Sequence, residues 1–369
     1  MQDRIHYLDS SRGLAAFVVF LSHFILVFYP GINQSWISAT PFRLLWDGSA
    51  AVVYFFIHSG FILSYRLEQR NFKLNKSSYF AFVWRRLFRI YPVYLVGLLA
   101  MFVLIRLGYF NRNPLGPLSS PLHMYWQMNT GWMDFFRQSL LVIRLPNDPV
   151  MRLLPQDWSL SIEIAVSLLL PALFSLQSKY KAWIVLFIYL AVQLLSLDPF
   201  VFDFSLGIAI VGWYQEFRNW WKTKTTMVSK FGILIAAILL ASSNHFLPAG
   251  LQEFSDFIFI HTKALGCALF LLILLASEKT KKLLTIRFLV LQGKCSYSIY
   301  LVHLALLFVC YPLASVKLFS GPSLLVFIYG VVFLLSVLLY FGIELPLIRL
   351  GRKLENKIFK NEVKKVVNP

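Results

Sequence analysis

The chain has 369 residues, of which 58% are hydrophobic and only 14% are charged. Soluble domains carry about 25% charged residues, so this composition excludes a soluble enzyme, a disordered chain and a disulfide-stabilised secreted domain. It predicts an all-α, polytopic integral membrane protein. The net charge of +18 is accounted for by basic cytoplasmic loops, and we expect no nucleic acid partner.

Apolar runs predict about ten membrane spans, since a helix needs ~20 apolar residues to cross a bilayer. The predicted spans are roughly 12–30, 48–66, 87–106, 156–176, 182–197, 199–214, 230–246, 254–276, 288–311 and 323–346. Residues 1–348 are therefore predicted to form one transmembrane domain, and 349–369 a basic cytoplasmic tail.

The segment 107–155 is the one long loop between the predicted spans, and it is rich in proline. Its apolar piece, 135–145, is too short to span a bilayer. We therefore expect an extracytoplasmic loop with an interfacial or re-entrant helix.

The distribution of lysine and arginine predicts the orientation. If the N-terminus is cytoplasmic, most of the 35 Lys and Arg residues fall on the cytoplasmic side, above all between spans two and three and after the last span. Cytoplasmic loops carry an excess of these residues. Both termini are therefore predicted to be cytoplasmic.

The cysteines give no reason to expect a metal site. Cys267, Cys295 and Cys310 stand in apolar runs, with no CxxC pair and no histidine at metal-ligand spacing. We expect small buried core residues.

Arg12 and His23 are ionisable residues in the first span. They lie eleven residues apart, which places them on one helix face, about 16 Å apart along the axis. Arg12 at the cytoplasmic mouth is suited to a phosphate, and a neutral His23 deeper in is suited to accept a proton. The structural alternative is a snorkelling arginine and a hydrogen-bonded packing histidine.

The fourth span opens with polar residues, including Trp158, Ser159 and Glu163. Ser159 and Glu163 are i, i+4 neighbours on one helix, and Glu163 lies about two turns into the span. A buried carboxylate can orient an imidazole or stabilise its cation. The alternative is a structural interhelical hydrogen bond.

Ser296, Tyr300 and His303 form one polar stripe on the ninth predicted span, because their spacing is i, i+4 and i+7. The stripe either lines a cavity or joins two helices.

A fourth candidate is the basic cluster at 85–92, which contains Arg86 and Arg89. Most of this cluster is explained by cytoplasmic topology alone. Glu344, near the inner end of the last span, is a plausible ion-pair partner for one of these arginines.

Taken in order, these segments resemble transmembrane acyltransferase family 3, bacterial membrane proteins that O-acylate glycans. The resemblance rests on the motifs LDSSRGLAA (8–16), VYFFIHSGF (53–61), RLFRIYP (86–92), WSLSIE (158–163) and SYSIYLVH (296–303). Arg12 and His23 match the family's spacing of arginine, ten residues and histidine. His58 stands where the family usually has an apolar residue, which leaves its role open. The extra extracytoplasmic hydrolase-like domain of some members is expected to be absent.

The resemblance implies a multi-pass enzyme of the cytoplasmic (inner) membrane, with acyl-coenzyme A (acyl-CoA), most often acetyl-CoA, as donor and no bound cofactor. The acceptor would be a hydroxyl of a lipid-linked or cell-surface polysaccharide such as lipopolysaccharide. His23 would be the general base, and Glu163 would orient it or help to bind the acceptor. The expected donor-binding residues are Arg12, Arg86 and Arg89, and those expected to line the substrate site are Trp158, Ser159, Tyr300 and His303.

The alternative from another functional class is a proton-coupled transporter or flippase of a glycan or lipid precursor. Intramembrane His and Glu residues suit that function as well. An internal inverted repeat would favour it, but the polar motifs of the first half do not recur in the second.

Overall fold

The computed structural model describes residues 5–108, 130–141, 153–180, 182–195, 197–245, 252–315 and 321–359. Within these ranges the chain is helical apart from short turns and has no strand, which confirms the predicted all-α class. It divides into two compact units. Unit 1 comprises Met1–Ser22, Gly31–Lys73 and Leu169–Lys294, and unit 2 comprises His23–Pro30, Leu74–Leu168 and Cys295–Pro369.

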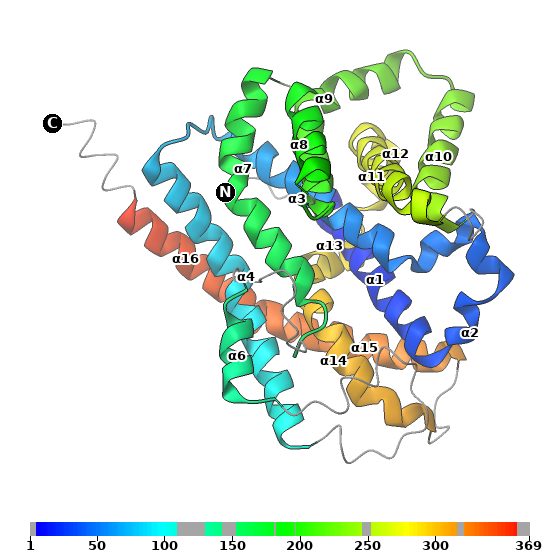
Figure 1. Cartoon of the computed structure of the whole chain (residues 1–369), viewed down its shortest axis with the longest axis vertical. Helices are drawn as coiled ribbons and strands as arrows, with labels where there is room; N and C mark the ends of the chain where they lie inside the picture. The colour runs from blue at the N-terminus through cyan, green and yellow to red at the C-terminus, as the bar shows by residue number, and fades with distance from the viewer. Residues whose placement is uncertain are drawn as a thin grey trace. The chain divides into compact units, whose positions relative to one another are not determined.

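Each predicted span has a helical counterpart (Figure 1). The counterparts are α1 (His6–Phe28), α3 (Gly48–Gln69), α4 (Lys76–Arg106), α7 (Asp157–Tyr180), α8 (Ala182–Leu194), α9 (Phe200–Thr223), α10 (Met227–Ala241), α11 (Gln252–Ala276), α13 (Arg287–Lys294) with α14 (Ser296–Ser315), and α15 (Gly321–Leu339).

By length and hydropathy, five helices of the described ranges can cross a membrane: α1, α3, α4, α7 and the run that begins with α15. The α13–α14 pair would make a sixth, and α8, α10 and α11 contribute shorter apolar stretches. These helices suit a multi-pass membrane protein. The total of ten spans and the side of each terminus stay predictions.

Unit 1 is built around the close approach of α3 and α9. A Cβ added at Gly60 would lie 2.1 Å from the carbonyl oxygen of Phe204, and one at Gly207 would lie 2.0 Å from that of Ile57. Only glycine permits such contact, and small residues are typical where membrane helices pack closely. Helix α11 packs against both α3 and α9, so these three helices form a frame that positions the polar side chains of unit 1.

Unit 2 is held together by contacts of α4 with α14 and α16 (Leu345–Ile358). The Tyr297 hydroxyl on α14 donates to the carbonyl of Ile90 on α4 at 2.7 Å. The indole of Trp84 donates to the carbonyl of Gly351 at 3.0 Å, where glycine leaves room for the ring of Phe88. These bonds fix the faces that α4 turns towards α14 and towards α16.

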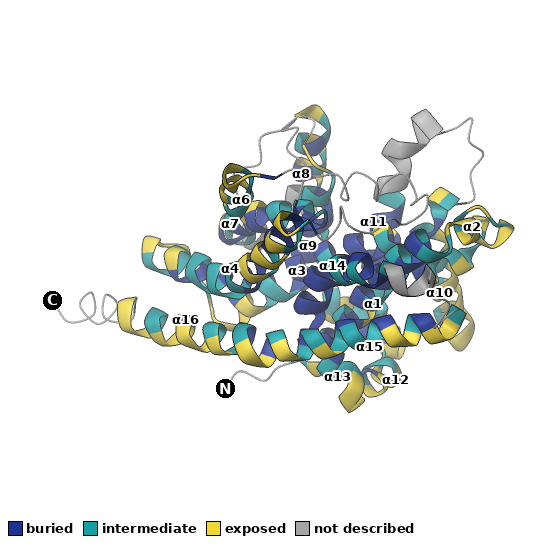
Figure 2. Ribbon diagram, turned by 90° about the horizontal axis from the view of Figure 1, so that it is seen from below, coloured by how far each residue is buried: buried dark blue, intermediate teal, exposed yellow. Residues whose placement is uncertain are grey.

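The last helices of unit 2 form one long run. A π-helical segment, Tyr340–Glu344, joins α15 to α16, and the run of 38 residues is about 57 Å long at 1.5 Å per residue. A bilayer core is only ~30 Å thick, so the run is too long to lie within it. Figure 2 shows exposed residues along much of α16, and residues 360–369 of the predicted tail lie outside the described residues.

The predicted apolar helix at 135–145 corresponds to α6 (Trp132–Ser139). It begins three residues earlier than predicted, because the Asp134 carboxylate accepts the backbone N–H of Gly131 and caps the first turn. The ring of Trp132 packs 4.8 Å from that of Phe102 on α4. Residues 142–145 lie outside the described residues, and whether α6 is interfacial or re-entrant stays a prediction.

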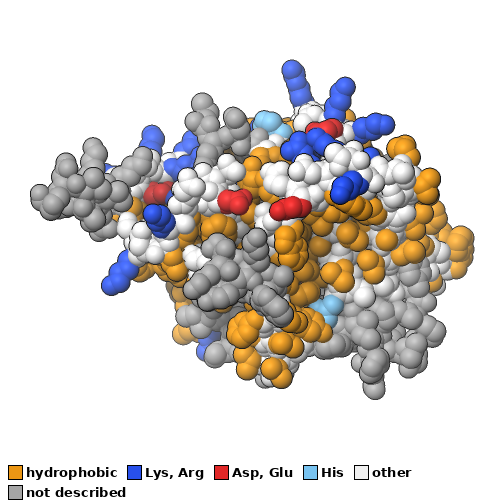
Figure 3. Space-filling model, turned by 90° about the horizontal axis from the view of Figure 1, so that it is seen from above, with side chains coloured by type: hydrophobic (Ala, Val, Ile, Leu, Met, Phe, Trp, Pro, Cys, Tyr) orange, Lys and Arg blue, Asp and Glu red, His pale blue; other side chains and the backbone are white. Residues whose placement is uncertain are grey.

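The surface agrees with burial in lipid. Figure 3 shows broad hydrophobic areas on the face in view, with lysine and arginine side chains gathered near its margin. Exposed large apolar side chains occur on helices of both units, including Leu99, Leu169, Phe187, Val326 and Leu338. Soluble monomers rarely expose apolar area on this scale.

Candidate functional site

The centre of the candidate site is a pair of histidines in unit 2. His23 lies on α1 and His303 on α14, with Nδ1 of His23 3.3 Å from Nε2 of His303 and ring centroids 5.1 Å apart. His303 is fully buried, whereas His23 is half-buried. The other nitrogen of His303, Nδ1, lies 2.6 Å from the carbonyl oxygen of Tyr300, one turn earlier on α14.

Tyr300 and Ser159 extend this polar site towards α7. The two hydroxyls lie 2.7 Å apart, and the Ser159 hydroxyl also donates to the carbonyl of Gln156 at 3.0 Å. The Tyr300 hydroxyl lies 3.4 Å from the same carbonyl, so the Gln156 oxygen can accept from either hydroxyl. The structure therefore brings together four of the predicted residues: His23, Ser159, Tyr300 and His303.

Glu163, one turn after Ser159 on α7, forms an ion pair with Arg86 of α4, with Nη2 and Oε1 2.6 Å apart. The structure thus pairs Glu163 with a predicted donor-binding residue, and it pairs His23 with His303. Arg86 is buried, whereas Arg89 is half-buried. In the described part of the chain, no carboxylate forms an ion pair with Arg89.

The other two predicted residues lie on α1 and α7. Arg12 is on α1 within unit 1, half-buried, beside Gly13, whose backbone meets that of Gly293. Trp158 is half-buried on the first turn of α7, next to Ser159.

Three further polar residues of unit 2 support the site, and the sequence interpretation gave them no role. The Gln156 side chain donates to the carbonyl of Leu301 at 2.5 Å. The Tyr94 hydroxyl donates to the carbonyl of Gln138 at 2.6 Å and also lies 3.3 Å from the Asp157 carboxylate. These contacts fix the start of α7. The polar pair Gln156-Asp157 directly before the α7 motif was the available signal in the sequence.

Glu344 is buried on the π-helical segment, where it accepts a hydrogen bond from Ser298 of α14 at 3.1 Å. π-helical turns occur often at functional sites. The predicted pairing of Glu344 with an arginine of the 85–92 cluster stays untested.

With this arrangement established, comparison with known families gives one decisive match. A family model described as an acyltransferase domain matches residues 5–341 of the 369. The chain belongs to acyltransferase family 3. The matched range contains every candidate residue from Arg12 to Glu163 and from Tyr300 to His303.

The searches of curated proteins and of solved structures found no match. The family and the apolar helices together make this protein a multi-pass membrane acyltransferase.

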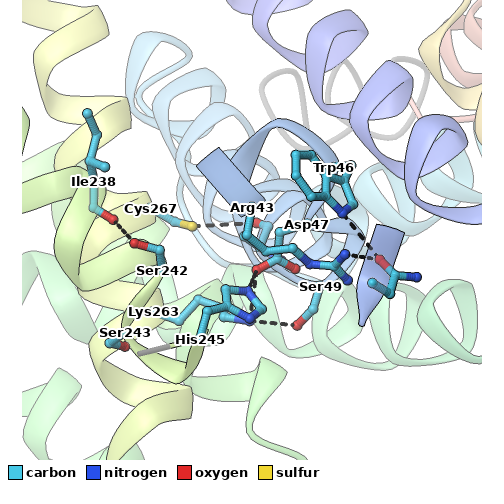
Figure 4. Close-up of polar contacts among 12 residues, drawn as sticks. Arg43, Trp46, Asp47, Ser49, Ile238, Ser242, Ser243, His245, Lys263 and Cys267 are labelled. Atoms are coloured by element: carbon cyan, nitrogen blue, oxygen red, sulfur yellow. Dashed lines mark hydrogen bonds and ion pairs between the residues drawn. The ribbon is translucent and has the colours of Figure 1, made fainter. Parts of the chain in front are cut away.

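The acyltransferase has a second buried polar cluster, in unit 1 (Figure 4). We call Asp47, His245 and Lys263 the unit 1 cluster. The Asp47 carboxylate lies 2.8 Å from Nε2 of His245 and 3.3 Å from Nζ of Lys263. Its other oxygen accepts the N–H of Ala50 and caps α3, and Lys263 also donates to Ser49 at 3.2 Å.

Asp47 is charged in this environment. Burial raises the pKa of its carboxyl, but the hydrogen bond with His245, the charge of Lys263 and the bond from Ala50 outweigh burial, so the pKa lies well below its ordinary value of 3.8. Asp47 and Lys263 are both almost completely buried. The unit 1 cluster is therefore a buried ion pair with its hydrogen-bonding groups satisfied.

Proposed function

We propose that this membrane acyltransferase transfers an acyl group, most readily acetyl, from acyl-CoA at the cytoplasmic face to a hydroxyl of a lipid-linked or cell-surface polysaccharide. The inner membrane is the proposed location. The observation that carries the proposal is the close contact between half-buried His23 and fully buried His303 in a chain of this family. A neutral imidazole is the usual general base at neutral pH.

In this mechanism His23 takes the proton of the acceptor hydroxyl as its oxygen attacks the thioester carbonyl. The tetrahedral intermediate then collapses with cleavage of the carbon–sulfur bond. The thiolate of CoA leaves and receives the proton from His23. The reaction consumes no net proton and needs no acyl-enzyme intermediate.

The Tyr300–Ser159 pair would contribute to acceptor binding. Their hydroxyls lie 2.7 Å apart beside the histidines, with Tyr300 and His303 rings 5.7 Å between centroids. Hydroxyl groups fixed in this way can bind the hydroxyls of a sugar. Trp158, next to Ser159, is the proposed aromatic face for a sugar ring.

Arg86 and Arg89 of α4 have different proposed roles, because Arg86 is engaged by a carboxylate and Arg89, among the described residues, is not. Arg86 is neutralised by Glu163 and would hold α4 and α7 in place, whereas Arg89 is available for a phosphate of CoA. Charge-assisted bonds are worth ~1.5–3 kcal/mol. Arg89→Ala should therefore raise the KM for acetyl-CoA about 10-fold or more, with Arg85→Ala, whose side chain pairs with Glu355, as control. Arg12 on α1 is proposed as a further donor-binding residue.

The direct test measures glycan acylation in cells that express wild-type or variant protein. Mass spectrometry of surface glycan should show the added acetyl mass with wild type, and His23→Ala should abolish it at equal membrane expression. His6→Ala, an exposed histidine at the start of the same helix, is the matched control and should be active. Full acylation by His23→Ala would refute the mechanism.

A further inference from the structure

The hydrogen-bond partners of His303 determine where its own protons lie. Its Nδ1 is 2.6 Å from the Tyr300 carbonyl oxygen, and its Nε2 is 3.3 Å from Nδ1 of His23. A carbonyl oxygen can only accept a hydrogen bond. Nδ1 of His303 therefore carries a hydrogen and donates it to Tyr300.

His303 is also neutral. It is fully buried, and within the described residues no carboxylate contacts it. An imidazolium there would be a buried charge without a counter-ion, which costs several kcal/mol. Because neutral imidazole has one N–H, Nε2 of His303 holds a lone pair and accepts.

The proton positions on His23 follow from this. If Nε2 of His303 accepts, Nδ1 of His23 must be the donor in the contact between the two rings. A neutral His23 then has its lone pair on Nε2, the nitrogen that faces away from His303. The backbone carbonyl of Tyr300 thus sets the tautomer of both rings in turn.

We propose that Nε2 of His23 is the atom that accepts the substrate proton, and that His303 is a positioning residue that holds His23 in this tautomer. The inference rests on the proposed function. It deepens that function, because His303 acts through His23 and not through the substrate. In many catalytic and metal sites a carboxylate orients the histidine in this way; here a neutral imidazole does so without adding a buried charge.

The proton transfer balances on these atoms. The acceptor O–H bond breaks as a bond forms between Nε2 of His23 and the proton, and the oxygen bonds to the thioester carbon. The Nδ1–H of His23 stays hydrogen-bonded to His303, which stabilises the transient imidazolium. When the carbon–sulfur bond breaks, the same Nε2 returns its proton to the sulfur of CoA.

Methylated histidines at position 23 distinguish the two nitrogens. A methyl group on Nε2 removes the proposed base and should reduce kcat at least 100-fold, since general bases contribute ~10²–10⁴-fold. A methyl group on Nδ1 leaves the Nε2 lone pair in place and removes only the bond to His303, so more activity should remain. The reverse order, or equal and full activity of both proteins, would overturn the assignment.

Substitutions at position 303 test whether His303 acts by accepting a hydrogen bond from His23. They give an answer even if both methylated proteins are inactive. His303→Leu fills a similar space without an acceptor and should lower kcat about 10–100-fold, with an unchanged KM for acetyl-CoA. His303→Gln offers an amide oxygen to Nδ1–H of His23 and should recover most of that loss. Equal activity of the two variants, at equal folded protein, would show that no hydrogen bond from His23 is needed.

Nitrogen-15 NMR of histidine-labelled protein gives a readout that does not depend on activity. Both His23 and His303 should show a protonated Nδ1 and an unprotonated Nε2, with the signals assigned from His23→Ala and His303→Leu samples. A protonated Nε2 on either ring overturns the inference. If the tautomers are as proposed but the wild type transfers no acyl group, the proposed function fails and the assignment of protons holds.

Discussion

Each unit of the acyltransferase contains a buried cluster with histidine, and the two clusters have opposite chemistry. In unit 1, His245 contacts the Asp47 carboxylate, which also pairs with Lys263. In unit 2, His23 contacts the imidazole of His303, and that imidazole is bound to a carbonyl. The unit 1 cluster is charged, and the charges of Asp47 and Lys263 balance each other. The histidine pair is neutral, and the contact between its rings involves Nδ1 but not Nε2 of His23.

The difference shows why residue types alone do not identify a catalytic site. An aspartate 2.8 Å from a histidine has the composition of a catalytic dyad. Asp47, however, also caps α3 and neutralises Lys263, so its charge is already balanced by groups of the protein. We therefore assign stability to the unit 1 cluster and chemistry to the histidine pair, and the following predictions test that division.

The largest expected effect is the loss of stability in Asp47→Ala. The substitution leaves Lys263 as a buried charge without its carboxylate, which costs ~3–5 kcal/mol, and removes a helix cap worth ~1 kcal/mol. The unfolding midpoint in detergent, followed by tryptophan fluorescence, should fall markedly. Acyl transfer per folded molecule should change little.

Glu278→Ala is the control for this measurement in the same unit. Glu278 also contacts several cations (Arg218, Lys222 and Lys281), but its side chain is 55% exposed. Exposed ion pairs contribute only ~0–1 kcal/mol, so its midpoint should stay close to wild type. An equal loss in the two variants would contradict the stabilising role of the buried pair.

A second prediction concerns the coupling between Asp47 and Lys263. Asp47→Asn keeps the cap of α3 but removes the charge, and Lys263→Met removes the ammonium while filling its space. Each single variant leaves one buried charge unpaired, whereas the double variant leaves none and should recover much of the loss. A double-mutant cycle should give a coupling of ~0.5–3 kcal/mol. Strict additivity would show that the two groups act independently.

The sequence predicted the positions of polar groups along helices better than the pairs they form. Helical spacing placed Ser159 and Glu163 on one face, and the structure confirms that both lie on α7. The spacing says nothing about the facing helix, because that depends on tertiary packing. Glu163 was predicted to orient His23 or to help bind the acceptor, which stays a prediction, and its ion pair with Arg86 was not predicted.

The fold shows the same limit. Composition predicted the all-α class, which is confirmed, and each apolar run has one or two helices as its counterpart. The break at Cys295 between α13 and α14 was not predicted, since the apolar run continues through it. His58, the departure from the family pattern, is buried on α3 with its ring 5.8 Å from that of Tyr54; these surroundings could not be read from one sequence.

The pH dependence of stability should reflect Asp47. Its pKa is depressed in the folded protein, so its contribution is fully present above the unfolded value of about 3.9 and is lost as the pH falls towards the folded value. The wild-type midpoint should therefore decrease in acid below pH ~4 more steeply than that of Asp47→Asn. If both proteins lose stability in parallel, other carboxylates are responsible.

The smallest expected effect on stability is that of Asp203→Asn on α9. This variant compares two buried aspartates of unit 1, Asp203 and Asp47. Asp203 is completely buried, and neither carboxyl oxygen has a hydrogen-bond partner within the described residues.

An ionised carboxylate without a partner is costly to bury, so Asp203 should be uncharged, and the isosteric amide should change stability by less than ~1 kcal/mol. Asp47→Asn is the matched comparison, since both are buried aspartates near Lys263 and only Asp47 contacts its ammonium. A large loss in Asp203→Asn would mean that Lys263 is shared between two carboxylates. The unit 1 cluster would then carry an excess negative charge, and its description as a compensated ion pair would be wrong.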